Sequence, residues 1–343
     1  MRLFVKSFLT YLRMRPYKGE IEKKKKLSGH CVPENGLRVK GRFCLSTARK
    51  ASIDRILVLI ALGAVFTGWL SATPRDPQKL SYFTELWHLD KEARAGKPWV
   101  TFHRSNYALA FSYNGSPNPA PLQAVDPAKT LVKPEVTFQL SFKAKVWQDM
   151  FGKDMDLWFG YTQRSFWQLY NFNDSSPFRE TNYEPEVLLN FRTRFALLGL
   201  KARFIQIGLN HQSNGQSEPL SKSWNRIVAN VGLERGEFSL LVKGWFHFPE
   251  SRESDDNPGI NKYMGYGEVW AYYFLKKHRL AVMLRDNLDF GENRGAIQLE
   301  WSFPMFAEFA GYVQYYLGYG ESLLDYNHRI NRIGVGFILT DWN

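Results

Sequence analysis

Cysteine is nearly absent from this sequence. The 343-residue chain has two cysteines, Cys31 and Cys44, and none after position 44. A disulfide framework or a cysteine-ligated metal centre is therefore excluded for most of the chain. Long hydrophobic runs are also missing, because no set of apolar segments approaches several spans of the ~20 residues that a membrane helix needs. The composition thus excludes a disulfide-stabilised domain and a bundle of membrane helices.

An excess of charge of one sign is absent outside the N-terminal segment. Residues 1–55 contain 15 of the 45 lysines and arginines but only 4 of the 33 acidic residues, so they carry +11 of the formal net charge of +12. Residues 56–343 carry a net charge of only +1. A basic surface for nucleic acid is therefore not expected on the main body of the chain, and we predict no nucleic-acid partner.

A short apolar run, Ile56 to Leu70, follows the basic segment and precedes small residues at 71–72. A basic flank, an apolar stretch of this length and small residues after it are typical of a secretory signal. A membrane anchor is the alternative, but the run is short for a span and contains two glycines. We expect residues 1–72 to be a basic leader and signal peptide, cleaved near Ala72 and followed by an N-terminal periplasmic segment at 73–98.

The dominant pattern in the rest of the chain is strict alternation. From Val136 to Val146 every second residue is apolar, and the residues between them are Thr, Gln, Ser and Lys. The same period recurs in residues 187–195, 226–234 and 297–303. A period of two predicts strands with one apolar and one polar face.

The alternation predicts twelve strands. They are centred on residues 99–114, 134–147, 155–170, 183–196, 200–213, 223–235, 237–249, 261–276, 279–290, 294–304, 306–319 and 327–341.

An even number of strands with short turns at one rim and longer loops at the other is typical of an outer-membrane barrel. We therefore predict an all-β fold, a 12-stranded antiparallel transmembrane β-barrel over residues 99–343, with apolar side chains facing lipid. A soluble barrel or sandwich is the alternative, but so much Arg and Lys on the inner faces argues against a dry core. Aromatic residues near strand ends would form the interfacial girdles: Trp158, Trp167, Trp245, Trp270, Tyr315 and Tyr319.

Three polar residues interrupt the lipid-facing stripe near one rim. His211 and Ser213 have the same parity as the apolar residues of strand 200–213, and Asn225 has that of strand 223–235. Polar groups are costly there unless they have a purpose. A serine, a histidine base and a third residue that orients the base form the general arrangement for acyl transfer. The backbone N–H groups of Ser213 and Gly215 could form an oxyanion hole.

His-x-Ser alone is a weak signal, because a histidine beside a serine in a solvated loop is common. The chain has no Gly-x-Ser-x-Gly segment, which excludes the usual soluble hydrolase arrangement.

Five segments in order carry a family resemblance: YTQ at 161–163, SSPFRETNYEP at 175–185, HQSNGQSEPLSKSWNR at 211–226, KYMGY at 262–266 and GYGESLLDYN at 318–327. From about Trp99 to the C-terminus, the sequence closely resembles the outer membrane phospholipase A family. The resemblance implies a twelve-stranded barrel that hydrolyses phospholipid acyl esters with calcium, as a homodimer. It implies that Ser213 is the nucleophile, His211 the general base and Asn225 the orienting residue.

The resemblance also implies calcium ligands and an interface residue. The Ser221 side chain and the Gln216 carbonyl would hold Ca²⁺, with Ser175 supplied by the second subunit. Gln216 stands where the family often has Arg, a change that a backbone ligand tolerates. A second, weaker site would use Glu218, in place of the usual Asp, and Asp256. Gln163, an uncharged amide in the lipid-facing stripe, would form a hydrogen bond across the dimer.

Three functions remain open from the sequence. The first is an outer-membrane phospholipase acting on phospholipid and lysophospholipid, with its active site toward the cell exterior. The second is a non-enzymatic barrel, a small channel or structural protein, with a vestigial site. The third is a soluble secreted esterase, which would be found in the aqueous fraction without detergent.

Overall fold

The computed structural model describes Gly63 and residues 80–339, apart from 252, 254, 290, 307 and 308. The expected signal peptide and its cleavage near Ala72 lie outside the described residues, except for Gly63. No helix in this described part is long and apolar enough to cross a membrane.

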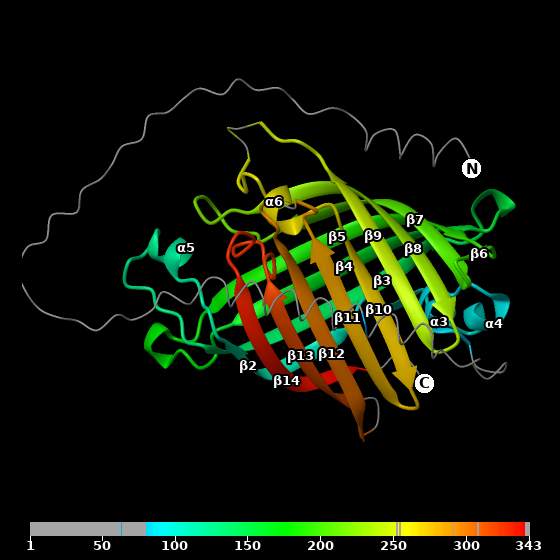
Figure 1. Ribbon diagram of the computed structural model, residues 1–343, viewed down its shortest axis with the longest axis horizontal. Helices are drawn as coiled ribbons and strands as arrows, with labels where there is room; N and C mark the ends of the chain where they lie inside the picture. The colour runs from blue at the N-terminus through cyan, green and yellow to red at the C-terminus, as the bar shows by residue number, and fades with distance from the viewer. Residues whose placement is uncertain are drawn as a thin grey trace, which may run out of the picture. The chain divides into compact units, whose positions relative to one another are not determined.

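Within the described residues, twelve long antiparallel strands form a closed β-barrel (Figure 1). The strands are β2 Asn106–Asn114, β3 Pro134–Trp147, β4 Met155–Trp167, β5 Phe178–Arg192, β7 Leu200–Ser213, β8 Ser223–Arg235, β9 Phe238–His247, β10 Gly267–Leu275, β11 His278–Asp286, β12 Gly295–Phe306, β13 Phe309–Gly318 and β14 Ile330–Leu339. Closure occurs where β14 pairs with β2. The predicted fold class is therefore confirmed.

Short elements occupy the connections between these strands. They are α3 Tyr82–Trp87, α4 Lys91–Arg94, α5 Ala120–Gln123, η1 Met150–Gly152, η2 Phe172–Asp174, α6 Asn261–Met264 and the two-residue strand β6 Ala196–Leu197. The longer connections follow β2, β4, β7, β9, β11 and β13, so they lie at one rim. The candidate catalytic and calcium-binding residues belong to this rim.

The first predicted strand, 99–114, is interrupted. It consists of β1 Val100–Phe102 and β2, and both pieces pair with β3. The Asn106 carboxamide bridges the break, since it accepts a hydrogen bond from Ser141 N at 2.7 Å and donates one to Ser141 O at 2.9 Å. The predicted strand 261–276 begins later than expected because α6 takes up its first residues.

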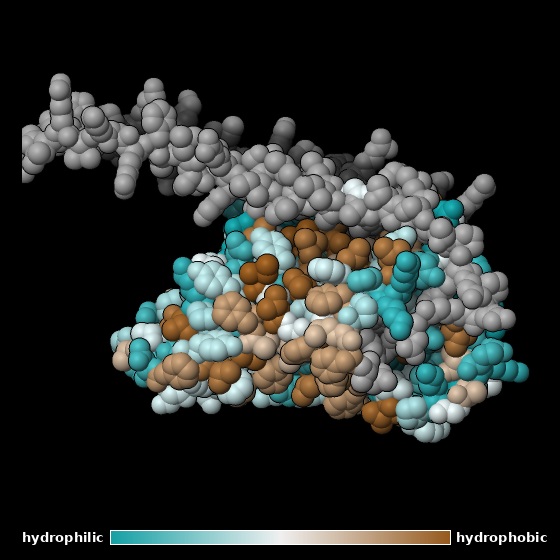
Figure 2. Space-filling view, turned by 90° about the horizontal axis from the view of Figure 1, so that it is seen from below, coloured by the Kyte–Doolittle hydropathy of each residue, from teal (hydrophilic) through white to brown (hydrophobic). Residues whose placement is uncertain are grey.

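The barrel places its apolar side chains outward and its polar side chains inward. On β3, Leu140 is 52% exposed and Phe142 is 42% exposed, whereas Ser141 and Lys143 between them are each 1% exposed. On the outer face in Figure 2, apolar side chains gather in the middle, and hydrophilic ones lie toward the two ends. This distribution suits a surface bounded by lipid hydrocarbon and by two aqueous phases.

The predicted aromatic girdle is wrong in part. Trp158 and Trp245 are buried in the barrel interior, where Trp158 contacts Trp87 of α3 at a ring-centroid distance of 5.6 Å. Trp270 stacks on Tyr272, whose ring packs against Tyr82 of α3. These tryptophans have the parity of the inward-facing residues. Proximity to a strand end was therefore a poorer guide than the period of two.

Candidate active site

His211 and Asn225 are directly opposed on neighbouring strands. His211 is the Cα partner of Asn225 in the β7–β8 ladder. The His211 Nδ1 atom lies 2.9 Å from Asn225 Oδ1. The structure therefore brings together the predicted base and the predicted orienting residue.

The pattern of backbone hydrogen bonds explains why these two side chains meet. Asn214 N donates a hydrogen bond to Lys222 O, so these two residues form a hydrogen-bonded pair. Hydrogen-bonded and non-hydrogen-bonded pairs alternate along the ladder, and His211 and Asn225, three positions away, therefore form a non-hydrogen-bonded pair. Asn225 O instead accepts from Phe248 N, on the other side of β8. In a non-hydrogen-bonded antiparallel pair the side chains are closer, about 4.5 Å apart at Cα.

Ser213 lies two residues beyond His211 on the same face of β7. Both side chains are half-buried and belong to the outward stripe that contains the exposed Ile207 and Leu209. Residues i and i+2 of a strand are about 6.6 Å apart. A histidine ring and a serine hydroxyl that lean toward each other can bridge that distance.

The turn after Ser213 is organised by Asn214, a buried residue that the sequence reasoning missed. Its Oδ1 accepts hydrogen bonds from Gln216 N at 3.2 Å and Lys222 N at 3.0 Å, and its Nδ2 donates to Leu220 O at 2.8 Å. The signal for it was present, because an Asn followed by Gly is typical of a turn. Gly215 has φ +65°, and a Cβ there would lie 3.0 Å from the Tyr183 ring.

Two of the predicted metal ligands are close together. Ser221 Oγ donates to Asp256 Oδ2 at 2.9 Å, and Ser223 N donates to Asp256 Oδ1 at 3.0 Å. Glu218 and Gln216 are exposed in the turn. Ser175 has φ +59° in the loop between η2 and β5, at the same rim. Across the described residues, no cluster of three or more His, Cys, Asp or Glu side chains could hold a metal ion.

A second residue missed from the sequence, the half-buried Glu250, lies near the site in the loop after β9. Its carboxylate is within electrostatic range of His211. Partial burial raises the pKa of Glu250, and the negative charges of Asp256 and Asp255 raise it further. Glu250 continues the alternation of Phe246 and Phe248, which is the sequence signal that could have identified it.

Gln163 lies on the outer face, as its parity predicts. It belongs to a chain of polar side chains on β4 and β5. Tyr161 OH donates to Gln163 Oε1 at 3.2 Å, Gln163 Nε2 donates to Ser165 Oγ at 3.3 Å, and Ser165 Oγ lies 3.1 Å from Thr181 Oγ1. A groove of about 370 Å³ runs beside this chain and is bordered by Gly215. The groove connects the polar chain to the turn after Ser213.

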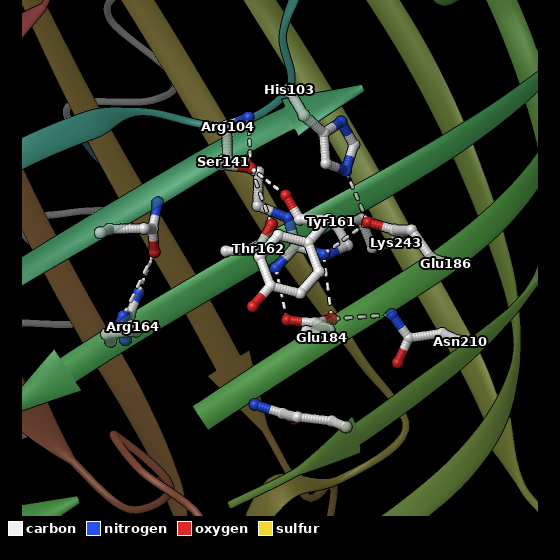
Figure 3. Close-up of polar contacts among 12 residues, drawn as sticks. His103, Arg104, Ser141, Tyr161, Thr162, Arg164, Glu184, Glu186, Asn210 and Lys243 are labelled. Atoms are coloured by element: carbon white, nitrogen blue, oxygen red, sulfur yellow. Dashed lines mark hydrogen bonds and ion pairs between the residues drawn. The ribbon is translucent and has the colours of Figure 1, made fainter. Parts of the chain in front are cut away.

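A charged network lies behind the site on the inner wall of the barrel (Figure 3). Glu184 of β5 accepts hydrogen bonds from Arg104 at 2.7 Å, Asn210 at 2.8 Å and Arg226 at 3.2 Å. Arg104 also donates to Glu186 at 2.9 Å. Asn210 and Arg226 directly precede and follow the residues that form the His211–Asn225 pair. The network therefore ties together the three strands whose outer faces carry the site.

The chain resembles proteins of known activity. Residues 83–339 match the family model described as Phospholipase A1. The phospholipase A1 of Escherichia coli K12 is 40% identical over 244 residues, which cover 71% of this chain and 83% of that protein. The phospholipase A1 of Klebsiella pneumoniae is 40% identical over 239 residues, which cover 70% and 82%.

Two solved structures also match this chain. Outer membrane phospholipase A from Escherichia coli matches with a TM-score of 0.66 at 38% identity, and covers 71% of this chain and 94% of that one. An outer membrane phospholipase from Salmonella typhi, solved as a dimer with bound calcium, matches with a TM-score of 0.66 at 37% identity, and covers 71% and 92%. The chain therefore belongs to the phospholipase A1 family, as an outer-membrane β-barrel with phospholipase activity.

Proposed function

We propose that this chain hydrolyses the sn-1 and sn-2 acyl esters of phospholipids and lysophospholipids through Ser213, His211 and Asn225, with calcium and as a homodimer. The observation that carries the proposal is the 2.9 Å contact of His211 with Asn225 on the outer face, with Ser213 beside them. A barrel that served only as a channel or as a structural protein would not need such a polar contact at the lipid surface.

In the proposed reaction, Ser213 Oγ attacks the ester carbonyl while His211 Nε2 takes its proton. The tetrahedral intermediate expels the glycerol alkoxide, which receives that proton from His211. Water, deprotonated in turn by His211, then attacks the acyl-enzyme and releases the fatty acid and Ser213. Asn225 keeps the imidazole oriented by accepting the Nδ1–H hydrogen bond. The N–H groups of Gly215 and Ser213 are the proposed donors to the oxyanion.

The residues of the rim fit a calcium ion. The proposed donors are the Ser221 hydroxyl, the Gln216 carbonyl and Ser175 of the second subunit, and an all-oxygen set is what calcium prefers. Ser221 Oγ donates a hydrogen bond to Asp256, which leaves the lone pairs of that oxygen available to a cation. Bound calcium would supply positive field near the oxyanion. Glu218 and Asp256 are proposed for the weaker second site.

The dimer is proposed to form along the polar chain that contains Gln163. A hydrogen bond to the partner within the hydrocarbon would contribute about 1–2 kcal/mol at most. The Salmonella typhi relative, solved as a dimer with bound calcium, supports a calcium-binding dimer. We also propose that the rim bearing the site faces the cell exterior, because the longer loops of such barrels are extracellular.

The test is hydrolysis of phospholipid by purified protein with and without calcium, together with labelling of Ser213 by a sulfonyl fluoride. Ser213→Ala should lower the rate by at least roughly 10³-fold and abolish labelling. Ser217→Ala, in the exposed part of the same turn, should behave as wild type. Chelation of calcium should abolish phospholipid hydrolysis by the wild-type protein. Full hydrolysis by Ser213→Ala would refute the mechanism, and channel conductance without hydrolysis would favour the non-enzymatic alternative.

A further inference from the structure

The loop that carries Ser175 is fastened to the end of a neighbouring loop. Residues 168–177 connect β4 to β5, and residues 129–133 are the last part of the connection from β2 to β3. Three side chains of the first loop, spaced three residues apart, form hydrogen bonds with the backbone of the second. They are Gln168 with Val132 N at 2.8 Å, Asn171 with Thr130 O at 3.0 Å and Asp174 with Thr130 N at 3.0 Å. The position of the 168–177 loop is therefore set from outside the loop itself.

Asp174 is the last of these three residues and directly precedes Ser175. Its Oδ2 atom accepts hydrogen bonds from both Thr130 N and Thr130 Oγ1, each at 3.0 Å, and from Asn171 Nδ2 at 3.4 Å. Lys129 Nζ lies 3.6 Å from the other carboxylate oxygen, Oδ1. The Asp174 carboxylate thus fixes the chain at residue 174 relative to residues 129–133.

The residue after Ser175 is held as well. Ser176 O accepts a hydrogen bond from Trp167 Nε1 at 2.9 Å, and Ser176 Oγ donates one to Leu169 O at 2.9 Å. The Trp167 ring stacks on Phe178, with ring centroids 5.3 Å apart. Ser175 itself is exposed. The loop therefore presents an exposed hydroxyl between two neighbours that are each fixed by hydrogen bonds.

The backbone at Ser175 has an unfavourable conformation. Ser175 has φ +59° and Ser176 has φ +52°, in the left-handed region that residues other than glycine rarely adopt. Such strain persists only where surrounding contacts hold the chain, and it is found where the direction of a side chain matters for function. The hydrogen bonds of Asp174 and Ser176 supply these contacts on either side of Ser175.

We propose that Asp174 is a positioning residue for calcium binding across the dimer, which holds Ser175 in the orientation that serves the second subunit. The inference rests on the proposed function, in which Ser175 is a calcium ligand supplied to the other barrel. In this role Asp174 touches neither calcium nor substrate. It acts as a hydrogen-bond acceptor, and because both Thr130 donors end on Oδ2, the single oxygen of an asparagine amide can take its place.

The first experiment measures the calcium concentration for half-maximal phospholipid hydrolysis. Asp174→Ala should raise this concentration roughly tenfold, because the hydrogen bonds that hold the loop are lost, and should leave kcat at saturating calcium unchanged. Asp174→Asn should stay close to wild type. The matched control is Asp126→Ala, because Asp126 is an exposed aspartate that accepts a hydrogen bond from Ala128 N at 3.0 Å in the same connection as Thr130.

Two results of this comparison would overturn the inference. An equal shift in Asp174→Asn and Asp174→Ala would show that the negative charge acts on calcium directly, and an equal shift in Asp126→Ala would show a general effect of loop stability. Ser175→Ala separates the inference from the proposed function. If Ser175→Ala weakens the calcium response and Asp174→Ala does not, only the inference fails. If Ser175→Ala responds to calcium as wild type does, the proposed ligand role of Ser175 fails, and the inference with it.

Mixed dimers, isolated with a different affinity tag on each subunit, test the route between the subunits. When Asp174→Ala is paired with Ser213→Ala, the one intact Ser213 receives Ser175 from a subunit with an unaltered loop, so the calcium response should be that of wild type. When the double variant Asp174→Ala/Ser213→Ala is paired with wild type, the intact site receives the altered loop, and the half-maximal calcium concentration should rise roughly tenfold. The opposite pattern would place the effect of Asp174 in its own subunit and overturn the inference.

Discussion

Asn225 is held by one contact at its side chain and one at its backbone. Its Oδ1 lies 2.9 Å from His211 Nδ1, and its backbone oxygen accepts a hydrogen bond of 2.9 Å from Phe248 N. The backbone bond fixes the end of β8, and the side-chain contact fixes the imidazole ring of His211.

The side-chain contact leads to a prediction for Asn225. Asn225→Ala should lower kcat roughly tenfold or more, because His211 loses the acceptor that orients its ring. The measurement is kcat of Asn225→Ala beside that of Ser217→Ala. Equal kcat values in the two variants would contradict an orienting role for Asn225.

The turn between β7 and β8 is built around one side chain. Asn214 makes three hydrogen bonds to the backbone of residues 216–222, and the proposed calcium ligands Gln216 and Ser221 lie within that span. The strands set where this turn begins and ends. Asn214 sets the conformation of the turn that carries the proposed ligands.

Asn214→Ala should therefore weaken the response to calcium. Loss of hydrogen bonds to a buried amide costs about 1–3 kcal/mol, so we expect the calcium concentration for half-maximal hydrolysis to rise roughly ten- to hundredfold. The matched control is Asn287→Ala. Asn287 is also buried and organises the loop after β11 through hydrogen bonds such as Asn287 Nδ2 to Glu292 O at 2.9 Å. The control should leave the calcium response unchanged, and an equal shift in both variants would refute the local role of Asn214.

On the scale of the molecule, the barrel carries a group of polar side chains on an outer surface that otherwise faces lipid. The site, the groove beside Gly215 and the polar chain with Gln163 adjoin one another on the outer wall formed by β4, β5, β7 and β8. A substrate that stays in the membrane can reach such a site without leaving the hydrocarbon. A second barrel placed against the same wall would cover the polar groups.

The dimer proposal predicts complementation between two inactive variants. Ser175→Ala lacks the proposed partner ligand but keeps its own catalytic residues, and Ser213→Ala has the reverse defect. In a twofold dimer, Ser175 of each subunit would contribute to the site of the other. In an equal mixture about half of the dimers are mixed and each of these has one complete site, so about a quarter of wild-type activity should return. The assay is calcium-dependent hydrolysis after mixing in detergent. Mixtures as inactive as the separate variants would show that Ser175 does not act across subunits.

Alternation in the sequence was sufficient to predict the barrel and the face of each proposed catalytic side chain. Alternation has a period that belongs to the strand, so parity alone placed His211, Ser213 and Asn225 outward and the charged residues inward. Both ends of β3, β7 and β8 were predicted without error for the same reason. The predicted girdle failed for Trp158 and Trp245, where nearness to a strand end was used in place of parity.

The hydrogen-bond partners of these side chains were set by the tertiary fold. The hydrogen bond from Phe248 N to Asn225 O depends on the β8–β9 register beyond the end of a strand. The three hydrogen bonds of Asn214 depend on the geometry of its loop. The interruption between β1 and β2, the place of α3 against the inner wall and the Glu184 network also depend on residues far apart in sequence. Periodicity is a local property of the backbone, whereas register and hydrogen-bond partners are set when distant strands pair and the barrel closes.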